Sequence, residues 1–197
     1  MSDFFTFLKL GFKHITDVNG YDHMLFIIAL CAAFTVHEWR KVLILITFFT
    51  IGHSIALALA VLNIVTVNSN LIELLIPITI LLTCLHTLVN NAKGEQLNSN
   101  PNITLKSIFV LFFGLIHGLG FSNYLRSLLG KTENLVLELF SFNLGLEIGQ
   151  ILILAIIFVI ITLFINNLNV KRRELCIAIC CLVIGLTLPL IKEKWIF

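Results

Sequence analysis

The chain has 197 residues, of which 58% are hydrophobic and 12% charged, and its formal net charge at pH 7 is +2. Its mean hydropathy of +1.02 lies far above that of a soluble globular domain. The few basic residues are spread over the ends of apolar runs, which excludes a basic face for nucleic acid. The composition therefore predicts a membrane protein whose surroundings are the lipid bilayer.

The first 18 residues alternate phenylalanine and leucine with Lys9 and Lys13, a pattern typical of a short helix lying in the membrane interface. No basic start precedes an apolar core and no small-residue cleavage site follows, so we expect residues 1–18 to be retained. Asp17 and Asn19 have the residue types of a turn or a helix cap. This segment would place His14 beside the first transmembrane span.

Six apolar runs approach or exceed the length of about 20 residues that a helix needs to cross a bilayer. They cover residues 20–37, 41–63, 71–90, 104–124, 135–165 and 174–191. Polar segments with turn-forming residues separate them, and the fifth run is long enough to require tilt. The sequence predicts an all-α, polytopic membrane helix bundle of about six transmembrane helices, in a single domain over residues 1–197.

The distribution of lysine and arginine predicts the orientation of this bundle. The second loop has no basic residue, whereas the first, third and fifth loops contain several: Arg40, Lys41, Lys93, Lys171, Arg172 and Arg173. Loops rich in lysine and arginine stay in the cytoplasm. We therefore expect a multi-pass protein of the cell (inner) membrane with both chain termini outside.

Ionisable side chains inside these runs are costly in lipid and mark candidate functional sites. With the predicted orientation, six of them fall in the outer half of the membrane or near its midplane: Asp22, His23, His53, Glu73, His117 and Glu147. Scattered structural residues would have no reason to share a depth. We therefore expect one common site. His14 could also point into this site if the turn residues that follow it break the helix.

Each residue taken alone also fits a purely structural role. His53 could hydrogen-bond a neighbouring helix, and this interpretation is favoured for His86, at the inner depth, and for His37, at a loop edge. Glu138 suits the first turn of a helix, where the helix dipole favours an acid. The convergence of the whole set, rather than any one residue, favours a site.

The candidate ligands at this depth are imidazoles and carboxylates, and none is a thiolate. This set suits Ni²⁺, Zn²⁺, Co²⁺, Fe²⁺ or Mn²⁺ rather than Cu⁺. One divalent ion would offset only part of the negative charge of Asp22, Glu73 and Glu147, whereas two ions, or one ion and a bound proton, would leave the site nearly neutral. Asn143 and Gln150 share a helical face with Glu147 and could orient it. The motifs "GLIHG" around His117 and "GLEIG" around Glu147 have the GxxxG spacing that favours close helix contact.

Five motifs in chain order resemble the HupE/UreJ family of hydrogenase and urease accessory proteins: "GFKHITDVNGYDHMLF", "FTIGHSIALAL", "IELLIPITI", "FGLIHGLGFS" and "FNLGLEIGQ". They run from residue 11 to about 150. The resemblance implies a six-span nickel or cobalt permease that needs the histidines and acids of these motifs, namely His14, Asp22, His23, His53, Glu73, His117 and Glu147, supported by Ser54. Pro77 departs from the small residues and serine of the family pattern.

Two classes of function remain open. The favoured one is a permease that carries a divalent transition metal, Ni²⁺ before the others, into the cytoplasm. Passage needs polar groups in the inner half, where the run "ILILAIIFVIITLF" after Gln150 is apolar apart from one threonine. This supports the alternative of an intramembrane metalloenzyme with a mono- or dinuclear centre, or of a metal sensor or accessory protein. The sequence leaves the oligomeric state open, a homo-oligomer included.

Overall fold

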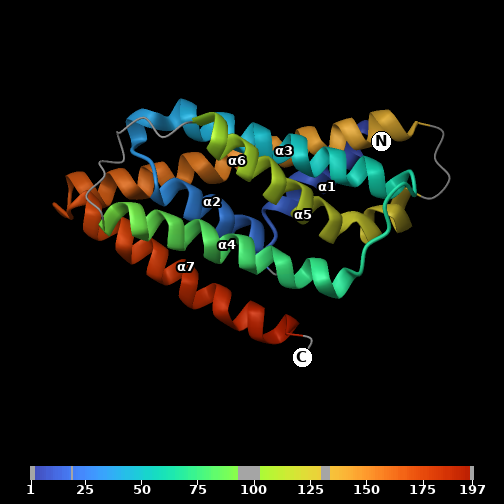
Figure 1. Cartoon of the computed structure of the whole chain (residues 1–197). Helices are drawn as coiled ribbons and strands as arrows, with labels where there is room; N and C mark the ends of the chain where they lie inside the picture. The colour runs from blue at the N-terminus through green and yellow to red at the C-terminus, as the bar shows by residue number, and fades with distance from the viewer. Residues whose placement is uncertain (1–2, 19, 93–102, 130–133, 196–197) are drawn as a thin grey trace.

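The computed structural model describes residues 3–18, 20–92, 103–129 and 134–195, and all regular structure within them is helical (Figure 1). The elements are α1 (Asp3–Ile15), α2 (Asp22–Ala32), the 3₁₀ helix η1 (Val36–Glu38), α3 (Trp39–Val61), α4 (Ser69–Ala92), α5 (Ile103–Leu129), α6 (Leu135–Asn166) and α7 (Arg172–Lys194). The predicted all-α class is confirmed.

Five helices of the described chain, α3 to α7, are long and apolar enough to cross a membrane. Their outer faces carry large exposed apolar side chains, such as Ile44 on α3, Phe112 on α5 and Ile156 on α6. A soluble protein does not leave so much apolar surface in water. The bundle is therefore that of a membrane protein, as the composition predicts.

The first crossing is built differently from the predicted span over residues 20–37. Helix α2 has only 11 residues, which is too short to cross the hydrocarbon core alone. Helix α1 does not lie apart as an interfacial segment, because it contacts α6 along its length and runs in the same direction, with α2 continuing beyond it (Figure 1). The two helices follow one another through the bundle and are separated by a break between Thr16 and Tyr21.

Glycine explains why α1 lies against α6. A Cβ atom on Gly11 would lie 1.9 Å from the carbonyl oxygen of Phe142, and one on Gly145 would lie 1.9 Å from that of Leu8. The two backbones are thus in direct contact, which any side chain at these positions would prevent. The pattern of apolar and basic residues in α1 does not reveal this contact.

Helices α3 and α5 approach each other in the same way. A Cβ atom on Gly52 would lie 2.1 Å from the carbonyl oxygen of Leu111, and one on Gly114 would lie 2.2 Å from that of Phe49. A Cβ atom on Gly118 would lie 2.5 Å from the carbonyl oxygen of His53. The motif "GLIHG" is therefore a helix contact, as its spacing predicts, and it places His117 of α5 beside His53 of α3.

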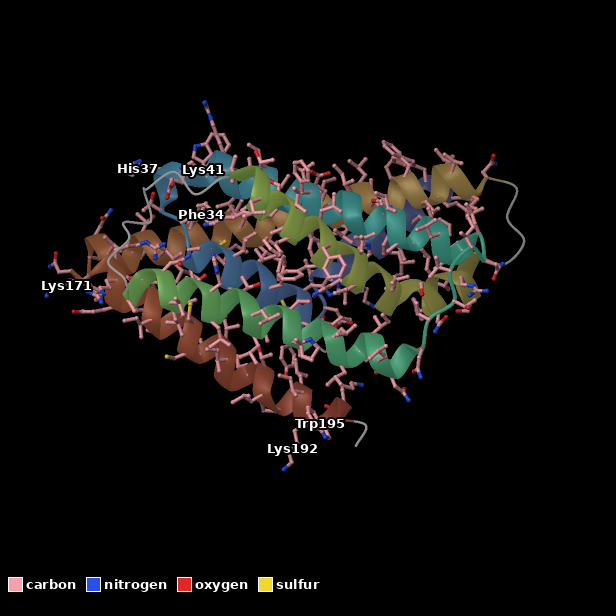
Figure 2. The ribbon with its side chains drawn as sticks, in the orientation of Figure 1. Phe34, His37, Lys41, Lys171, Lys192 and Trp195 are labelled. Carbon is pink, nitrogen blue, oxygen red and sulfur yellow. The ribbon has the colours of Figure 1, made fainter. Side chains whose placement is uncertain are left out.

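Helix α2 lies inside the bundle, in contact with α4, α6 and α7, and most of its residues are buried. Residues 33–38 and 167–171 lie at one end of the bundle, which we call the loop end, where Figure 2 shows Lys41 and Lys171. Residues 62–68 lie at the opposite end, whereas α7 ends below the middle of the bundle, where Figure 2 labels Lys192 and Trp195. The break between α1 and α2 lies between these ends.

Candidate metal centre

The candidate metal centre lies at the break between α1 and α2. His14 lies near the end of α1, and Asp22 and His23 begin α2. The hydroxyl of Thr16 donates to the carbonyl oxygen of Phe12 at 2.8 Å, which also accepts the backbone N–H of Thr16 at 3.2 Å, so α1 ends here on a shared acceptor. The carboxylate of Asp22 lies at the N-terminus of α2, where the helix dipole favours negative charge. Two helix ends therefore meet at the site.

Four histidines from four different helices gather at this break. The ring centroid of His23 lies 4.7 Å from that of His14, 4.9 Å from that of His117 and 6.0 Å from that of His53. The centroids of His14 and His53 are also 6.0 Å apart. Helices α1, α2, α3 and α5 thus bring together imidazoles from positions that span more than one hundred residues of the chain, with His23 in the middle.

The imidazoles are buried, yet much of their hydrogen-bonding capacity is unused. His53 and His117 are 0% exposed and His23 is 3% exposed. Five ring nitrogens have no hydrogen-bond partner among the described residues: Nε2 of His14, Nε2 of His23, Nδ1 and Nε2 of His53, and Nδ1 of His117. An unpaired buried polar group costs about 1–3 kcal/mol. A set of unpaired nitrogens in one place is the arrangement expected of metal ligands.

Neighbouring side chains determine which nitrogen of two histidines is free. Nδ1 of His23 lies 2.8 Å from Oδ1 of Asp22, and a carboxylate only accepts hydrogen bonds, so Nδ1 carries the proton. Nε2 of His117 lies 3.2 Å from the hydroxyl of Thr79, which donates its own hydrogen to the carbonyl oxygen of Ile76 at 2.7 Å. His117 therefore donates from Nε2. The lone pairs of His23 Nε2 and His117 Nδ1 remain available.

Two groups of side chains in the described chain could hold a metal ion. One consists of His14, His23 and His53, and the other of Asp22, His23 and His117. Within each group the candidate ligand atoms lie within 4.8 Å of one another. Because both groups contain His23, they describe two adjacent positions for one ion, or a site for two ions.

A cavity of about 370 Å³ leads to the cluster between α4, α7 and the break. Its lining includes four residues of the cluster, His14, Asp22, His23 and His117, and four further charged residues, Asp17, Glu73, Glu193 and Lys194. The side chains of Glu73 and Lys194 are 42% and 38% exposed, in contrast with the buried imidazoles. The cavity therefore has a charged, accessible mouth and a floor of histidine.

Glu73 lies at this mouth rather than in either candidate group. Its Oε2 is 2.8 Å from Nζ of Lys194, in the last turn of α7. Pro77, one turn further along α4, also lines the cavity and has no N–H to donate to the carbonyl oxygen of Glu73. The predicted common site thus separates into a histidine cluster and an outer carboxylate.

Glu147 is also outside both candidate groups. Its Oε1 accepts a hydrogen bond from the hydroxyl of Thr47 at 2.8 Å. Gln150, expected to orient Glu147, instead accepts a hydrogen bond from Thr50 at 2.8 Å. Thr47 and Thr50 precede His53 on α3 by two turns and one turn, so these pairs lie between the cluster and the loop end. We call the four residues Thr47, Thr50, Glu147 and Gln150 the α3–α6 seam.

The other two predicted supporting residues have local partners. Asn143 donates from Nδ2 to the carbonyl oxygen of Leu139 at 2.8 Å, and its buried Oδ1 has no partner among the described residues. The hydroxyl of Ser54 donates to the carbonyl oxygen of Thr50 at 2.7 Å. Neither contact orients Glu147 in the way that the spacing on the helix suggests.

The residues given structural interpretations in the sequence lie away from the cluster. His86 contacts Asn90 on its own helix, with 3.0 Å between Nε2 and Nδ2, and His37 belongs to η1 at the loop end (Figure 2). Glu138 lies in the first turn of α6, as its structural interpretation predicts, and is buried there, with no partner for its Oε2 among the described residues. Asn19 lies outside the described residues.

Sequence reasoning missed several residues that shape the centre. Thr79 falls within the motif "IELLIPITI", but only its contact with His117 shows its role. The ring of Phe121 covers His14, with centroids 3.8 Å apart, and stacks on Phe142 at 5.3 Å. Nothing in the sequence connects Lys194 with Glu73.

The geometry agrees with the comparison to known proteins. The family model described as HupE / UreJ protein matches residues 1–194, nearly the whole chain. No curated protein and no solved structure matches the chain. The matched family is associated with nickel and cobalt uptake or with accessory functions, which suits a membrane bundle with histidine and aspartate groups that could bind a metal. The chain belongs to the HupE/UreJ family.

Proposed function

We propose that this protein is an integral membrane permease whose cargo is Ni²⁺ or Co²⁺, bound by the histidine cluster and Asp22. The observation that carries the proposal is the set of five buried ring nitrogens without hydrogen-bond partners among the described residues. A cluster that served only structure would pair these nitrogens, because leaving them unpaired destabilises the fold. The family's association with nickel and cobalt uptake favours the same ions.

The ligand chemistry suits this cargo. Imidazole nitrogens bind the later divalent ions of the first transition row well, and Ni²⁺ and Co²⁺ are among them. The hydrogen bonds from His23 to Asp22 and from His117 to Thr79 hold two rings with a free lone pair. The negative charge of Asp22 offsets part of the charge of a divalent ion, which lowers the cost of holding it in the membrane.

The broken helix also favours transport. Many transporters bind their substrate near the middle of the bilayer, where a discontinuous helix exposes two helix ends. Here the break between α1 and α2 brings His14 and Asp22 to such a position. A discontinuous crossing is poorly suited to a merely structural helix, because it leaves backbone groups that must find other partners.

The α3–α6 seam supplies oxygen atoms beyond the cluster. Thr50 and Gln150 are buried, with Thr50 one turn before His53 on α3, and Thr47, the partner of Glu147, lies one turn nearer the loop end. Hydroxyl, amide and carboxylate oxygens bind Ni²⁺ less strongly than imidazole does. Passage from the cluster to the seam would therefore lower the affinity for the ion and allow its release, on the side that the loop charges predict to be cytoplasmic.

The alternative function is an intramembrane metalloenzyme. The observation that favours it is that both candidate groups share His23, as a dinuclear centre would require, beneath a cavity open to small molecules. The two proposals differ in one property, because an enzyme binds metal without moving it across the membrane. Transport therefore discriminates them.

The test uses the purified protein, first in detergent with Ni²⁺ in a calorimeter and then in proteoliposomes with radiolabelled nickel. We expect stoichiometric binding that is lost in His23→Ala and His117→Ala and retained in His86→Ala, a control with the same residue change outside the cluster. We also expect uptake above that of empty liposomes. Unchanged stoichiometry in the cluster variants would contradict the site, and binding without uptake would favour the enzyme.

A further inference from the structure

The mouth of the cavity holds a positive charge where a cation is proposed to arrive. Nζ of Lys194 lies 2.8 Å from Oε2 of Glu73, and both residues line the cavity that reaches His23 and His117. Lys194 is the only lysine or arginine among the described residues that line this cavity. A lysine at the mouth of a cation site opposes binding unless a carboxylate neutralises it.

The pair joins two helices that form the walls of the cavity. Glu73 lies near the start of α4 and Lys194 lies at the end of α7, and these helices contact each other. Both side chains are partly exposed, at 42% and 38%. Ion pairs with this exposure are weak, so a stronger cation can displace the ammonium without unfolding either helix.

We propose that Lys194 determines which cations reach the histidine cluster, by occupying the carboxylate of Glu73 as a tethered monovalent cation. A divalent ion has twice the charge of a lysine ammonium and binds the carboxylate more strongly, so it displaces Lys194. A free monovalent ion gains no electrostatic advantage over the ammonium already present. This inference rests on the proposed function, since it requires that the cluster receives a divalent metal through this cavity.

The other carboxylates of the cavity determine how the removal of Lys194 changes the selectivity between divalent and monovalent cations. Asp17 and Glu193 also line the cavity, so the mouth keeps a negative charge when Lys194 moves away. That charge attracts a divalent ion more strongly than a monovalent one. Without Lys194, the carboxylates would attract every cation, and the distinction between valences would weaken.

Lys192 provides a matched control. It lies two residues before Lys194 on the same helix and carries the same charge, but it points away from the bundle (Figure 2) and does not line the cavity. If the rate of Ni²⁺ association depended only on the net charge near the C-terminal end of α7, substitution of Lys192 or of Lys194 would change it equally. A change caused by the pair with Glu73 would follow only from Lys194.

The experiment measures the association rate of Ni²⁺ with the full chain in detergent by stopped flow. Trp39→Phe leaves Trp195, beside Lys194, as the single tryptophan reporter of the chain's two. We expect Lys194→Ala to raise the rate about threefold to tenfold at low ionic strength and Glu73→Gln to lower it about tenfold. The double variant should return to within about twofold of the parent, and Lys192→Ala should stay within the same range.

Selectivity is measured in the same assay by replacing choline chloride with sodium chloride at constant ionic strength, so that screening stays equal. We expect Na⁺ to leave the rate of Ni²⁺ association with the parent protein unchanged. In Lys194→Ala, Na⁺ should lower this rate about threefold or more. Equal responses of Lys192→Ala and Lys194→Ala, or a double variant as slow as Glu73→Gln, would overturn the inference.

Equilibrium binding separates failure of this inference from failure of the proposed function. All mouth variants should keep the Ni²⁺ stoichiometry of the parent, because the imidazoles are untouched. If the parent binds Ni²⁺ but the mouth variants share its rate and its response to Na⁺, the inference fails and the metal site stands. If the parent binds no Ni²⁺, the proposed function fails and the inference fails with it.

Discussion

Nδ1 of His23 donates a hydrogen bond to Oδ1 of Asp22 over 2.8 Å, and this contact decides which nitrogen of the central histidine can bind a metal. The same carboxylate oxygen accepts the backbone N–H of His23 at 2.8 Å, so the carboxylate is held in place by the residue that it orients. Since His23 belongs to both candidate groups, its orientation affects either position of the ion.

Substitution of Asp22 tests this relationship. Asp22→Asn keeps an oxygen acceptor for His23 but removes the negative charge, and we expect it to weaken Ni²⁺ binding about tenfold to a hundredfold without changing the number of ions bound. Calorimetric titration of the purified protein measures both quantities. The matched control is Asp17→Asn, which removes a carboxylate from the same cavity outside the candidate groups. Equal losses in the two variants would show that the overall negative charge of the cavity, rather than the position of the Asp22 charge beside His23, acts on the site.

The contact between Thr79 and His117 makes a second prediction. Thr79→Val removes the acceptor that keeps the proton on Nε2 of His117, so the imidazole can adopt the other tautomer and lose its free Nδ1. We expect a decrease in Ni²⁺ affinity of about tenfold, measured by the same titration, and near-complete retention in Thr79→Ser.

The control for this prediction lies one turn further along α4. The hydroxyl of Thr83 donates to the carbonyl oxygen of Thr79 at 2.8 Å, within its own helix, and Thr83 belongs to neither candidate metal group. Thr83→Val should therefore bind Ni²⁺ as the unchanged protein does. If it loses as much affinity as Thr79→Val, the effect belongs to α4 as a whole and not to the tautomer of His117.

The approach of α1 to α6 predicts a large effect of a single methyl group. Gly145→Ala would place its Cβ 1.9 Å from the backbone oxygen of Leu8, so α1 must move away and take His14 with it. Overfilled contacts cost about 1–3 kcal/mol, and we expect a lower midpoint of thermal unfolding in detergent together with weaker Ni²⁺ binding. Gly185→Ala is the control, since nothing lies within 4 Å of its added Cβ and alanine favours a helix.

The sequence predicts the class of fold because apolar runs of this length have few alternatives to membrane helices. It also points to His14, Asp22, His23, His53 and His117, since each is an ionisable residue at a similar depth in or beside an apolar run. The depth of a residue in the membrane, however, does not determine the direction in which its side chain points around the helix axis. Glu73 and Glu147 share that depth, but one faces Lys194 and the other faces Thr47.

The break between α1 and α2 could not be predicted from the sequence, for a different reason. An apolar segment of 13 residues with two lysines fits an interfacial helix as well as half of a crossing. The outcome depends on the contacts of Gly11 with Phe142 and of Gly145 with Leu8, across more than one hundred residues of chain. Local patterns carry no information about such a contact, and the same holds for the pair formed by Glu73 and Lys194.

The position of Glu147 makes the last prediction. Its carboxylate accepts a hydrogen bond from Thr47 and lies outside both candidate groups, so Glu147→Gln should leave equilibrium binding of Ni²⁺ to the cluster unchanged within about twofold. As the charged member of the α3–α6 seam, Glu147 should instead assist movement of the ion towards the loop end. We expect nickel uptake into proteoliposomes to fall about tenfold, because the negative charge that raises the local cation concentration is lost.

Glu174→Gln is the control for this prediction, because Glu174 is an exposed acid at the loop end, 3.9 Å from Lys171 and away from the seam. It should affect neither binding nor uptake. If Glu147→Gln abolishes Ni²⁺ binding itself, then Glu147 is a direct ligand, as the resemblance implies, and α6 must move towards the cluster when metal binds. If it alters neither quantity, the ion does not pass along the seam, and release must take another route between the helices.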